Sequence, residues 1–165
     1  MTNTAPDDQL HLQQLVGNAQ LAMLTTVTSD GKHVSRPMAL QESEFDGDLW
    51  FFAYEDSAKV AQIRAEPSVN VAFSDTKNKA WTSIAGHAEV VADRAKAEDL
   101  YTPTLKAWFP EGLDTPGITL IKVHADSAEY WEGPSSTVGF ALGTLRAAVT
   151  KNPDNDPITN KTVQL

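Results

Sequence analysis

The dipeptide Asp30-Gly31 constrains the fold of this chain more than any other feature of its sequence. It stands between two apolar, strand-like runs, residues 21–28 and 33–40. Asp-Gly is typical of a tight hairpin turn, because both residues tolerate a positive φ. The sequence therefore predicts that these two runs form an antiparallel β-hairpin.

The rest of the chain continues the pattern of short strand-like runs separated by turns. Strands are expected at residues 21–28, 33–40, 49–54, 69–73, 81–91, 118–123 and 127–131, with a small edge strand at 162–165. The regular alternation of strand and helix that a doubly wound parallel sheet requires is absent. Short antiparallel strands of this number commonly close into a barrel. We therefore predict a mainly β fold with short helices, built as a β-barrel of about six main antiparallel strands.

A few short helices are expected between these strands. They cover residues 7–19, with Asp7 or Asp8 as N-cap, residues 57–65, residues 94–105 after the N-cap Asp93, and, more weakly, residues 140–149. Pro67 stops the second helix. Gly86, inside the run 81–91, predicts a bulge or a bend in that strand.

Composition narrows the class of protein. The 165 residues fit one domain, 1–165, and cysteine is absent, which agrees with a cytoplasmic protein. Lysine and arginine number 13 against 22 aspartates and glutamates, and the net charge of −9 argues against a nucleic-acid partner. The first residues do not resemble a secretory signal, and no apolar run approaches the ~18 residues of a membrane span, so no membrane association is expected.

Familiar catalytic and metal-binding motifs are missing. The sequence contains no dinucleotide glycine fingerprint, no Walker loop and no Gly-x-Ser-x-Gly elbow. The four histidines, His11, His33, His87 and His124, show no paired metal-ligand spacing, so no metal site is expected.

One group of residues points to an anion. In a strand over residues 33–40, Arg36 shares a face with apolar residues, where a cation needs a partner. Ser57 and Lys59 open a predicted helix, whose N-terminus favours an anion. Together with the aromatic run 49–54, these residues suit a phosphorylated, flat, aromatic cofactor. The alternative is that Arg36 and Lys59 form ordinary surface ion pairs of little energetic weight.

The four tryptophans allow two interpretations, core packing or a platform for a planar ring or a dimer interface. Trp131 ends a strand just before Gly133-Pro134, and both interpretations stay open for it. For Trp50, Trp81 and Trp108 the residue pattern favours packing.

Seven short motifs occur in a specific order along the chain. They are Ser35-Arg36-Pro37-Met38, Leu49-Trp50-Phe51-Phe52, Ser57-Ala58-Lys59-Val60, Pro67-Ser68-Val69-Asn70-Val71, Ile84-Ala85-Gly86, Trp108-Phe109-Pro110-Glu111-Gly112 and Glu129-Tyr130-Trp131. Over about residues 10–165 the chain resembles the general stress protein 26 family, within the flavin-binding split-barrel superfamily that includes pyridoxamine 5'-phosphate oxidase. The resemblance implies a split β-barrel, a homodimer, and FMN, with FAD as the alternative, in clefts at the subunit interface.

The resemblance also assigns roles to individual residues. Those implied to contact the flavin are Arg36, Pro37 and Met38 along its ring and phosphate, Phe52 and Ala53 beside the ribityl chain, Ser57 and Lys59 at the phosphate, Trp131 from the partner subunit at the ring, and Trp81 in place of a ring-contacting glutamine.

Three departures from the oxidase pattern bear on function. Ala53 replaces a frequent hydroxyl residue, which removes one hydrogen bond worth roughly 1 kcal/mol. Ala58 stands where the oxidase has a second phosphate-binding basic residue. The stretch after Trp131 lacks the arginine that holds the oxidase substrate. Oxidation of a pyridoxine phosphate is therefore not expected.

Three functions remain open from the sequence. The first is an FMN-binding general stress protein without fast turnover of its own, which buffers flavin or supports a redox response. The second is a flavin-dependent oxidoreductase acting on an unidentified small molecule. The third is a dimeric scaffold barrel that has lost flavin, against which the joint presence of Arg36, Ser57 and Lys59 counts.

Overall fold

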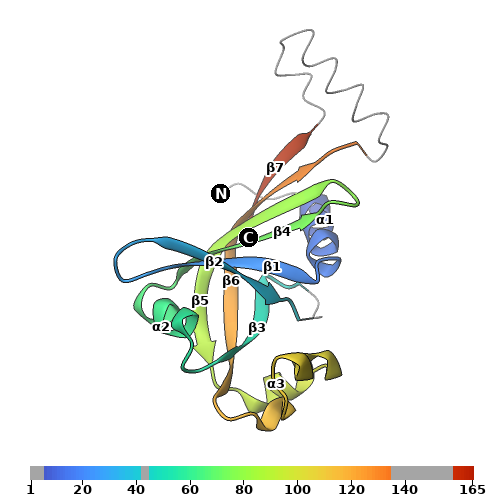
Figure 1. Cartoon of the computed structure of the whole chain (residues 1–165). Helices are drawn as coiled ribbons and strands as arrows, with labels where there is room; N and C mark the ends of the chain where they lie inside the picture. The colour runs from blue at the N-terminus through green and yellow to red at the C-terminus, as the bar shows by residue number, and fades with distance from the viewer. Residues whose placement is uncertain (1–5, 42–44, 135–157) are drawn as a thin grey trace.

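The computed structural model describes residues 6–41, 45–134 and 158–165. Its helices and 3-10 turns are α1 (Pro6–Gly17), α2 (Ala58–Ala65), α3 (Arg94–Leu100), η1 (Pro103–Ala107) and η2 (Gly112–Asp114). Its strands are β1 (Leu21–Val27), β2 (His33–Ala39), β3 (Asp48–Tyr54), β4 (Ser68–Asp75), β5 (Ala80–Val91), β6 (Ile118–Glu132) and β7 (Thr159–Gln164). Figure 1 shows the strands wrapped around a common centre, with α2 at one side and α3 with the 3-10 turns beyond one end.

The strands form one antiparallel sheet in the order β2-β1-β4-β5-β6-β3, and β7 pairs with the far half of β6. The prediction of a mainly β, antiparallel fold with short helices is confirmed. The β1–β2 hairpin turns at Asp30-Gly31 as expected: Gly31 has a φ of +80°, and its N–H donates to the carbonyl of Thr28 at 2.9 Å. Glycine suits this position because it takes a positive φ without steric penalty.

The two strands expected at 118–123 and 127–131 are a single strand, β6. Asp126 is an extra residue in β6, because Ser127 pairs with Ala85 while Ala125 pairs with Gly86. This bulge shifts the inward-facing residues of β6 from odd to even numbers, which interrupts the apolar alternation that the sequence shows. The irregularity expected at Gly86 lies here: a Cβ on Gly86 would come within 2.1 Å of the carbonyl oxygen of His124.

Two helices differ from their expected extents. Helix α1 begins at Pro6, so Asp7 and Asp8 lie in its first turn rather than at its N-cap. Helix α3 ends at Leu100, and η1 follows from Pro103, because proline cannot continue an α-helix. The expected cap of α3 is present, since the Asp93 carboxylate accepts from the N–H of Lys96 at 2.9 Å. The expected helix at 140–149 falls outside the described residues.

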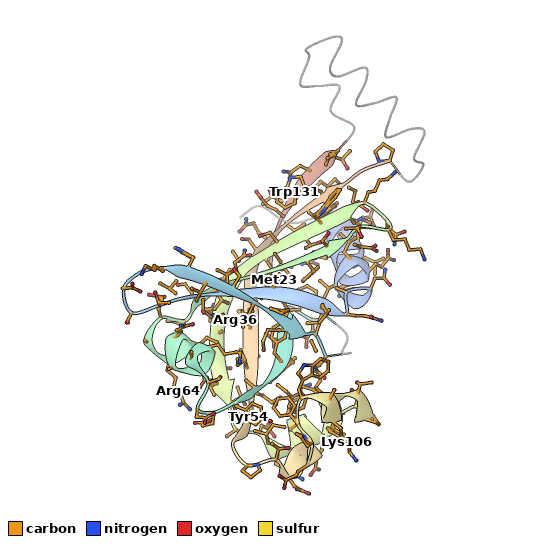
Figure 2. All side chains as sticks on the ribbon, in the orientation of Figure 1. Met23, Arg36, Tyr54, Arg64, Lys106 and Trp131 are labelled. Atoms are coloured by element: carbon orange, nitrogen blue, oxygen red, sulfur yellow. The ribbon has the colours of Figure 1, made fainter. Side chains whose placement is uncertain are left out.

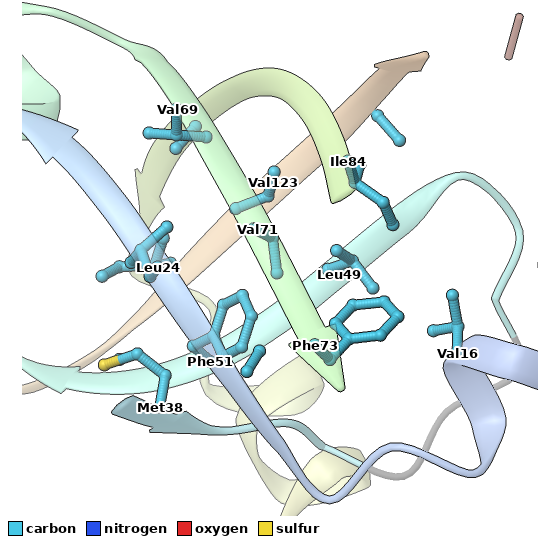
Figure 3. Packing of buried hydrophobic residues seen from close by; sticks show 14 of the residues in the cluster. Val16, Leu24, Met38, Leu49, Phe51, Val69, Val71, Phe73, Ile84 and Val123 are labelled. Carbon is cyan, nitrogen blue, oxygen red and sulfur yellow. The ribbon is translucent and has the colours of Figure 1, made fainter. Parts of the chain in front are cut away.

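A single large core fills the space inside the curved sheet (Figure 3). Leu24, Phe51, Val71 and Ile121 are fully buried there, and α1 contributes Leu12 and Val16. A smaller cluster, which includes Phe52, Leu105 and Phe109, joins the end of β3 to the segment after α3. No helix in the described part of the chain is long and apolar enough to cross a membrane.

The sheet does not close. Its end strands, β2 and β3, approach each other just past the end of β2, where the N–H of Gln41 donates to the carbonyl of Trp50 at 3.3 Å. Among the described residues no strand ladder joins β2 to β3. The barrel is therefore split along this seam, and the seam is where the candidate site lies.

Candidate functional site

A cavity of about 220 Å³ lies at the seam between β2 and β3. Its lining comes from four elements and the residues beside them: Arg36, Pro37, Met38, Ala39, Gln41, Phe52, Ala53, Tyr54, Lys59, Leu105, Trp108 and Phe109. Six of the residues expected to contact a flavin are among them: Arg36, Pro37, Met38, Phe52, Ala53 and Lys59. The structure thus brings together in space three segments that are separate in the sequence.

Arg36 is held in place by neutral oxygen atoms. Its Nη1 donates to the carbonyl of Leu24 at 3.1 Å and to Oγ1 of Thr26 at 2.7 Å, and its Nη2 donates to Oε1 of Gln62 at 3.2 Å. No carboxylate of the described residues pairs with it. Since a guanidinium has five N–H donors, two remain for a ligand. Burial lowers the pKa of Arg36, because it disfavours the charged form.

Lys59 reaches the same cavity from the first turn of α2. Its side chain is half-buried and has no hydrogen bond or ion pair with any residue that the structure describes. Burial, and secondly the charge of Arg36, lower the pKa of Lys59. Two cations that repel each other at one cavity create a local positive potential in a chain whose net charge is −9. Such a pair is suited to an anion that carries more than one negative charge.

Ser57 occupies the N-cap position of α2, but its hydroxyl does not cap the helix. The Oγ atom is buried and has no hydrogen-bond partner among the described residues, whereas buried hydroxyls are usually paired. Ser57 is not part of the cavity wall. Its position beside the free N–H groups at the start of α2 nevertheless provides further donors next to Lys59.

The walls of the cavity are apolar and aromatic. Phe109 packs against Tyr54 and Phe52 with ring centroids 4.9 and 6.1 Å apart, and the Tyr54 hydroxyl donates to the carbonyl of Trp108 at 2.8 Å. Trp108 is 56% exposed, so the expectation that it packs in the core is wrong. Sequence reasoning missed this wall because contacts between residue 54 and residues 108–109 depend on topology. In the sequence, the adjacent aromatic residues Trp108 and Phe109 were the signal that could have indicated this wall.

Trp81 and Trp131 lie elsewhere in the same chain. They are register partners on β5 and β6, and neither lines the cavity. Figure 2 shows Trp131 in the upper part of the molecule, apart from Arg36 in the middle and Tyr54 below it. A contact between Trp131 and a flavin therefore requires a second subunit, as the resemblance implies, and the same holds for Trp81. Both roles stay predictions.

The cavity contains few groups for acid–base chemistry. Its lining includes no histidine, aspartate or glutamate, and the one hydroxyl, on Tyr54, is already hydrogen-bonded. Within residues 6–41, 45–134 and 158–165, no group of three or more potential ligands could hold a metal ion. The residues present are suited to binding an anion beside a flat, apolar group.

The matching family model covers residues 7–155 and describes proteins like pyridoxamine 5'-phosphate oxidase. The chain therefore belongs to the pyridoxamine 5'-phosphate oxidase-like family. Among curated proteins it is similar to Protein bli-3 of Neurospora crassa, with 29% identity over 152 residues that cover 86% of this chain and 73% of that protein.

Solved structures share the fold. A general stress FMN/FAD binding protein from Xanthomonas citri is 29% identical with a TM-score of 0.69, covering 80% of this chain and 93% of that one. A protein described as general stress family, from Xanthomonas campestris pv. campestris, is 31% identical with a TM-score of 0.68, covering 80% and 92%. A general stress protein 26 from Jannaschia sp. CCS1 aligns over 98% of this chain and 100% of its own, with a TM-score of 0.74 and 20% identity.

Proposed function

We propose that this protein binds FMN at the β2–β3 seam, with the phosphate held by Arg36, Lys59 and Ser57. The observation that carries the proposal is the pair of half-buried cations, Arg36 and Lys59, which face one cavity without a carboxylate partner among the described residues. A terminal phosphate carries about −1.5 to −2 charges at pH 7 and offers three acceptor oxygens. It would compensate both cations and give the buried Ser57 hydroxyl a partner.

The other cavity residues suit the remainder of the cofactor. Phe52, Ala53 and Met38 offer apolar contact beside the phosphate end, and Trp108 and Phe109 offer aromatic surface. When bound, the flavin supplies redox chemistry, while the protein positions and shields it. A related protein from Xanthomonas citri is described as binding FMN or FAD, which supports a flavin here. We favour FMN over FAD because its terminal phosphate matches the two cations.

We further propose that the functional unit is a homodimer formed through the outward face of β1, β2, β4 and β5. This face carries a run of uncharged outward residues: Leu21, Met23, Thr25, Ser35, Pro37, Asn70, Ala72, Ser83 and Ala85. Leu21 and Met23 are 60% and 43% exposed, and Met23 pairs with Pro37 on one side and Ala72 on the other. In a chain with net charge −9, an uncharged and partly apolar sheet face favours a second copy of itself.

The cavity and this face meet at Pro37, which lines the cavity and is exposed on the outward side of β2. Trp81 and Trp131 continue the same outward face onto β5 and β6. A cavity of about 220 Å³ falls below the ~300–1,000 Å³ of typical small-molecule sites, so one chain encloses only part of a flavin. A partner whose Trp131 approached Pro37 would complete the enclosure.

We infer a role without fast turnover, as a general stress protein that buffers flavin or supports a redox response. The absence of histidine and carboxylate from the cavity lining supports this role over an oxidoreductase with its own acid–base residues. Two similar solved proteins are described as general stress proteins, which supports the stress role.

The absorption spectrum of protein purified without added cofactor tests the proposal. We expect flavin bands, and release of FMN on denaturation identified by chromatography. Protein without flavin bands that also fails to bind added FMN in calorimetry would overturn flavin binding and leave the scaffold alternative. Bleaching by NADH or NADPH followed by turnover on an acceptor would favour the oxidoreductase.

A further inference from the structure

Two exposed histidines stand directly opposite each other on the outer face of the sheet, away from the flavin cavity. His87 of β5 and His124 of β6 are register partners, and their ring centroids are 5.1 Å apart. The bulge at Asp126 produces this arrangement, because it changes which residues of β6 face outward. After the bulge, the even-numbered residues of β6 face inward. If the same alternation held at residue 124, His124 would point into the core.

Each imidazole is oriented by a carboxylate. Nδ1 of His87 lies 3.2 Å from Oδ1 of the bulge residue Asp126, and Nδ1 of His124 lies 2.9 Å from Oδ1 of Asp48. A carboxylate accepts a hydrogen bond from Nδ1–H, and in this tautomer the lone pair of Nε2 is free to bind a ligand. Metal-binding histidines in proteins almost always have such a partner on the other ring nitrogen.

The charges around the two rings favour a cation. Asp48 places a carboxylate beside His124. Lys122 is the nearby cation, and it is already paired with Asp48 at 3.1 Å and lies 3.9 Å from Glu89. Asp126 adds a further carboxylate beside His87.

We propose that His87 and His124 form a two-histidine site for a divalent late transition metal, bound through their Nε2 atoms, with water at the remaining positions. The two side chains are 57% and 56% exposed, so an ion from solvent can reach both rings. Imidazole suits Cu²⁺, Ni²⁺ and Zn²⁺, and Cu²⁺ binds most tightly in this series. The 37-residue separation of the pair explains why sequence spacing gave no sign of it.

Titration of the full-length, untagged protein with Cu²⁺ tests this site, with calorimetry for affinity and electron paramagnetic resonance for the ligand atoms. We expect one Cu²⁺ per chain with two nitrogen ligands. His87→Ala and His124→Ala should each weaken binding by more than the ~10–100-fold typical for loss of a supporting carboxylate. Each variant should also reduce the nitrogen ligands from two to one. Asp126→Asn removes a supporting carboxylate and should weaken Cu²⁺ binding within that 10–100-fold range.

His33 supplies the matched control, because it is an exposed strand histidine whose side chain has no partner among the described residues. His33→Ala should leave Cu²⁺ affinity and the nitrogen signal unchanged. Equal losses in the His33 and His87 variants, or a two-nitrogen signal that survives the double His87/His124 variant, would overturn the site. Thermal unfolding of each variant verifies that it is folded. Because neither histidine lines the flavin cavity, flavin content should not change with any of these substitutions.

Discussion

Arg36 of β2 and Lys59 of α2 line the same cavity, where burial and, secondly, the charge of Arg36 lower the pKa of Lys59. Most cations on protein surfaces sit beside carboxylates, which raise their pKa values. Here two cations share one cavity, and the partners of Arg36 are a carbonyl, a hydroxyl and an amide. The flavin-free protein therefore maintains an unfavourable arrangement that an incoming phosphate would relieve.

Removal of the Lys59 charge should discriminate between flavins. Lys59→Ala should weaken FMN binding by roughly 1.5–3 kcal/mol, the usual contribution of a charge-assisted contact. This corresponds to about a ten- to a hundredfold loss of affinity. Riboflavin lacks the phosphate and should lose much less. Calorimetric titration of both flavins measures the difference.

Lys106→Ala is the control for this variant, because Lys106 lies on η1 beside the cavity without lining it (Figure 2). Lys106→Ala should change neither the affinity for FMN nor the affinity for riboflavin. Equal losses of FMN and riboflavin in Lys59→Ala would show that Lys59 has a structural role and does not bind phosphate.

The same lysine should oppose folding when flavin is absent. Because its pKa is lowered in the folded protein, protonated Lys59 is less favourable there than in the unfolded chain. This penalty is present at neutral pH and is lost as the pH rises through the lowered pKa towards the ordinary value of 10.5. Flavin-free Lys59→Met should therefore melt above the wild type at pH 7, and the difference should shrink as the pH approaches 10.5.

Thermal unfolding followed by circular dichroism at pH 7 and at higher pH measures this effect, with Lys106→Met as the reference. A lower melting temperature for Lys59→Met at pH 7 would mean that the packing of the lysine stem outweighs the charge penalty. Saturating FMN should reverse the order of the two melting temperatures, so that the wild type melts above Lys59→Met. The reason is that bound ligand stabilises only the folded state that binds it.

Ser57→Ala separates the two roles of an N-cap serine. Loss of an N-cap side chain typically costs ~1 kcal/mol of stability. The Ser57 hydroxyl makes no cap hydrogen bond and has no partner among the described residues, so the flavin-free variant should be about as stable as the wild type. Its FMN affinity should fall while riboflavin binding is kept. A large drop in melting temperature without flavin would contradict this account.

Much of this fold could be predicted because its information is local. The Asp30-Gly31 turn and the alternation along β4 and β5 each depend on neighbouring residues, and the structure agrees with both. Strand β6 was expected as two strands because the bulge at Asp126 reverses the alternation in mid-strand, and such a reversal looks like a break between elements.

Part of the candidate site could likewise be predicted from local sequence. The inward position of Arg36 follows from strand alternation, and that of Lys59 from its place in the first turn of a helix. The wall formed by Leu105, Trp108 and Phe109 could not be found this way, because it depends on how the segment after α3 folds back against β3. The His87–His124 pair was hidden for a similar reason, since its register is set by the bulge.

The proposed dimer makes a prediction for the outward face of β1. A stable dimer would bury well above ~1,000 Å² in total, and a carboxylate placed within that interface would lose hydration without gaining a partner. Met23→Asp should therefore shift the protein from two chains to one in light scattering at micromolar concentration. Leu10→Asp, at an exposed residue of α1, is the control and should leave the dimer intact. A wild-type protein that is monomeric at this concentration would contradict the prediction.

Trp131 provides the sharpest test of a site shared between two subunits. It lies on the outward face at the far end of β6, opposite Trp81 and away from the cavity of its own chain. If the partner's cavity receives it, Trp131 should stack on the flavin ring, quench flavin fluorescence and tighten binding by roughly 0.5–1.5 kcal/mol. Trp131→Ala should then restore the fluorescence of bound FMN while light scattering still reports a dimer.

Trp108→Ala offers a comparison from within the same chain, since Trp108 lines the cavity and its removal should weaken FMN binding whether or not a dimer forms. Unchanged spectrum and affinity in Trp131→Ala, in a protein that remains dimeric, would show that Trp131 serves only packing.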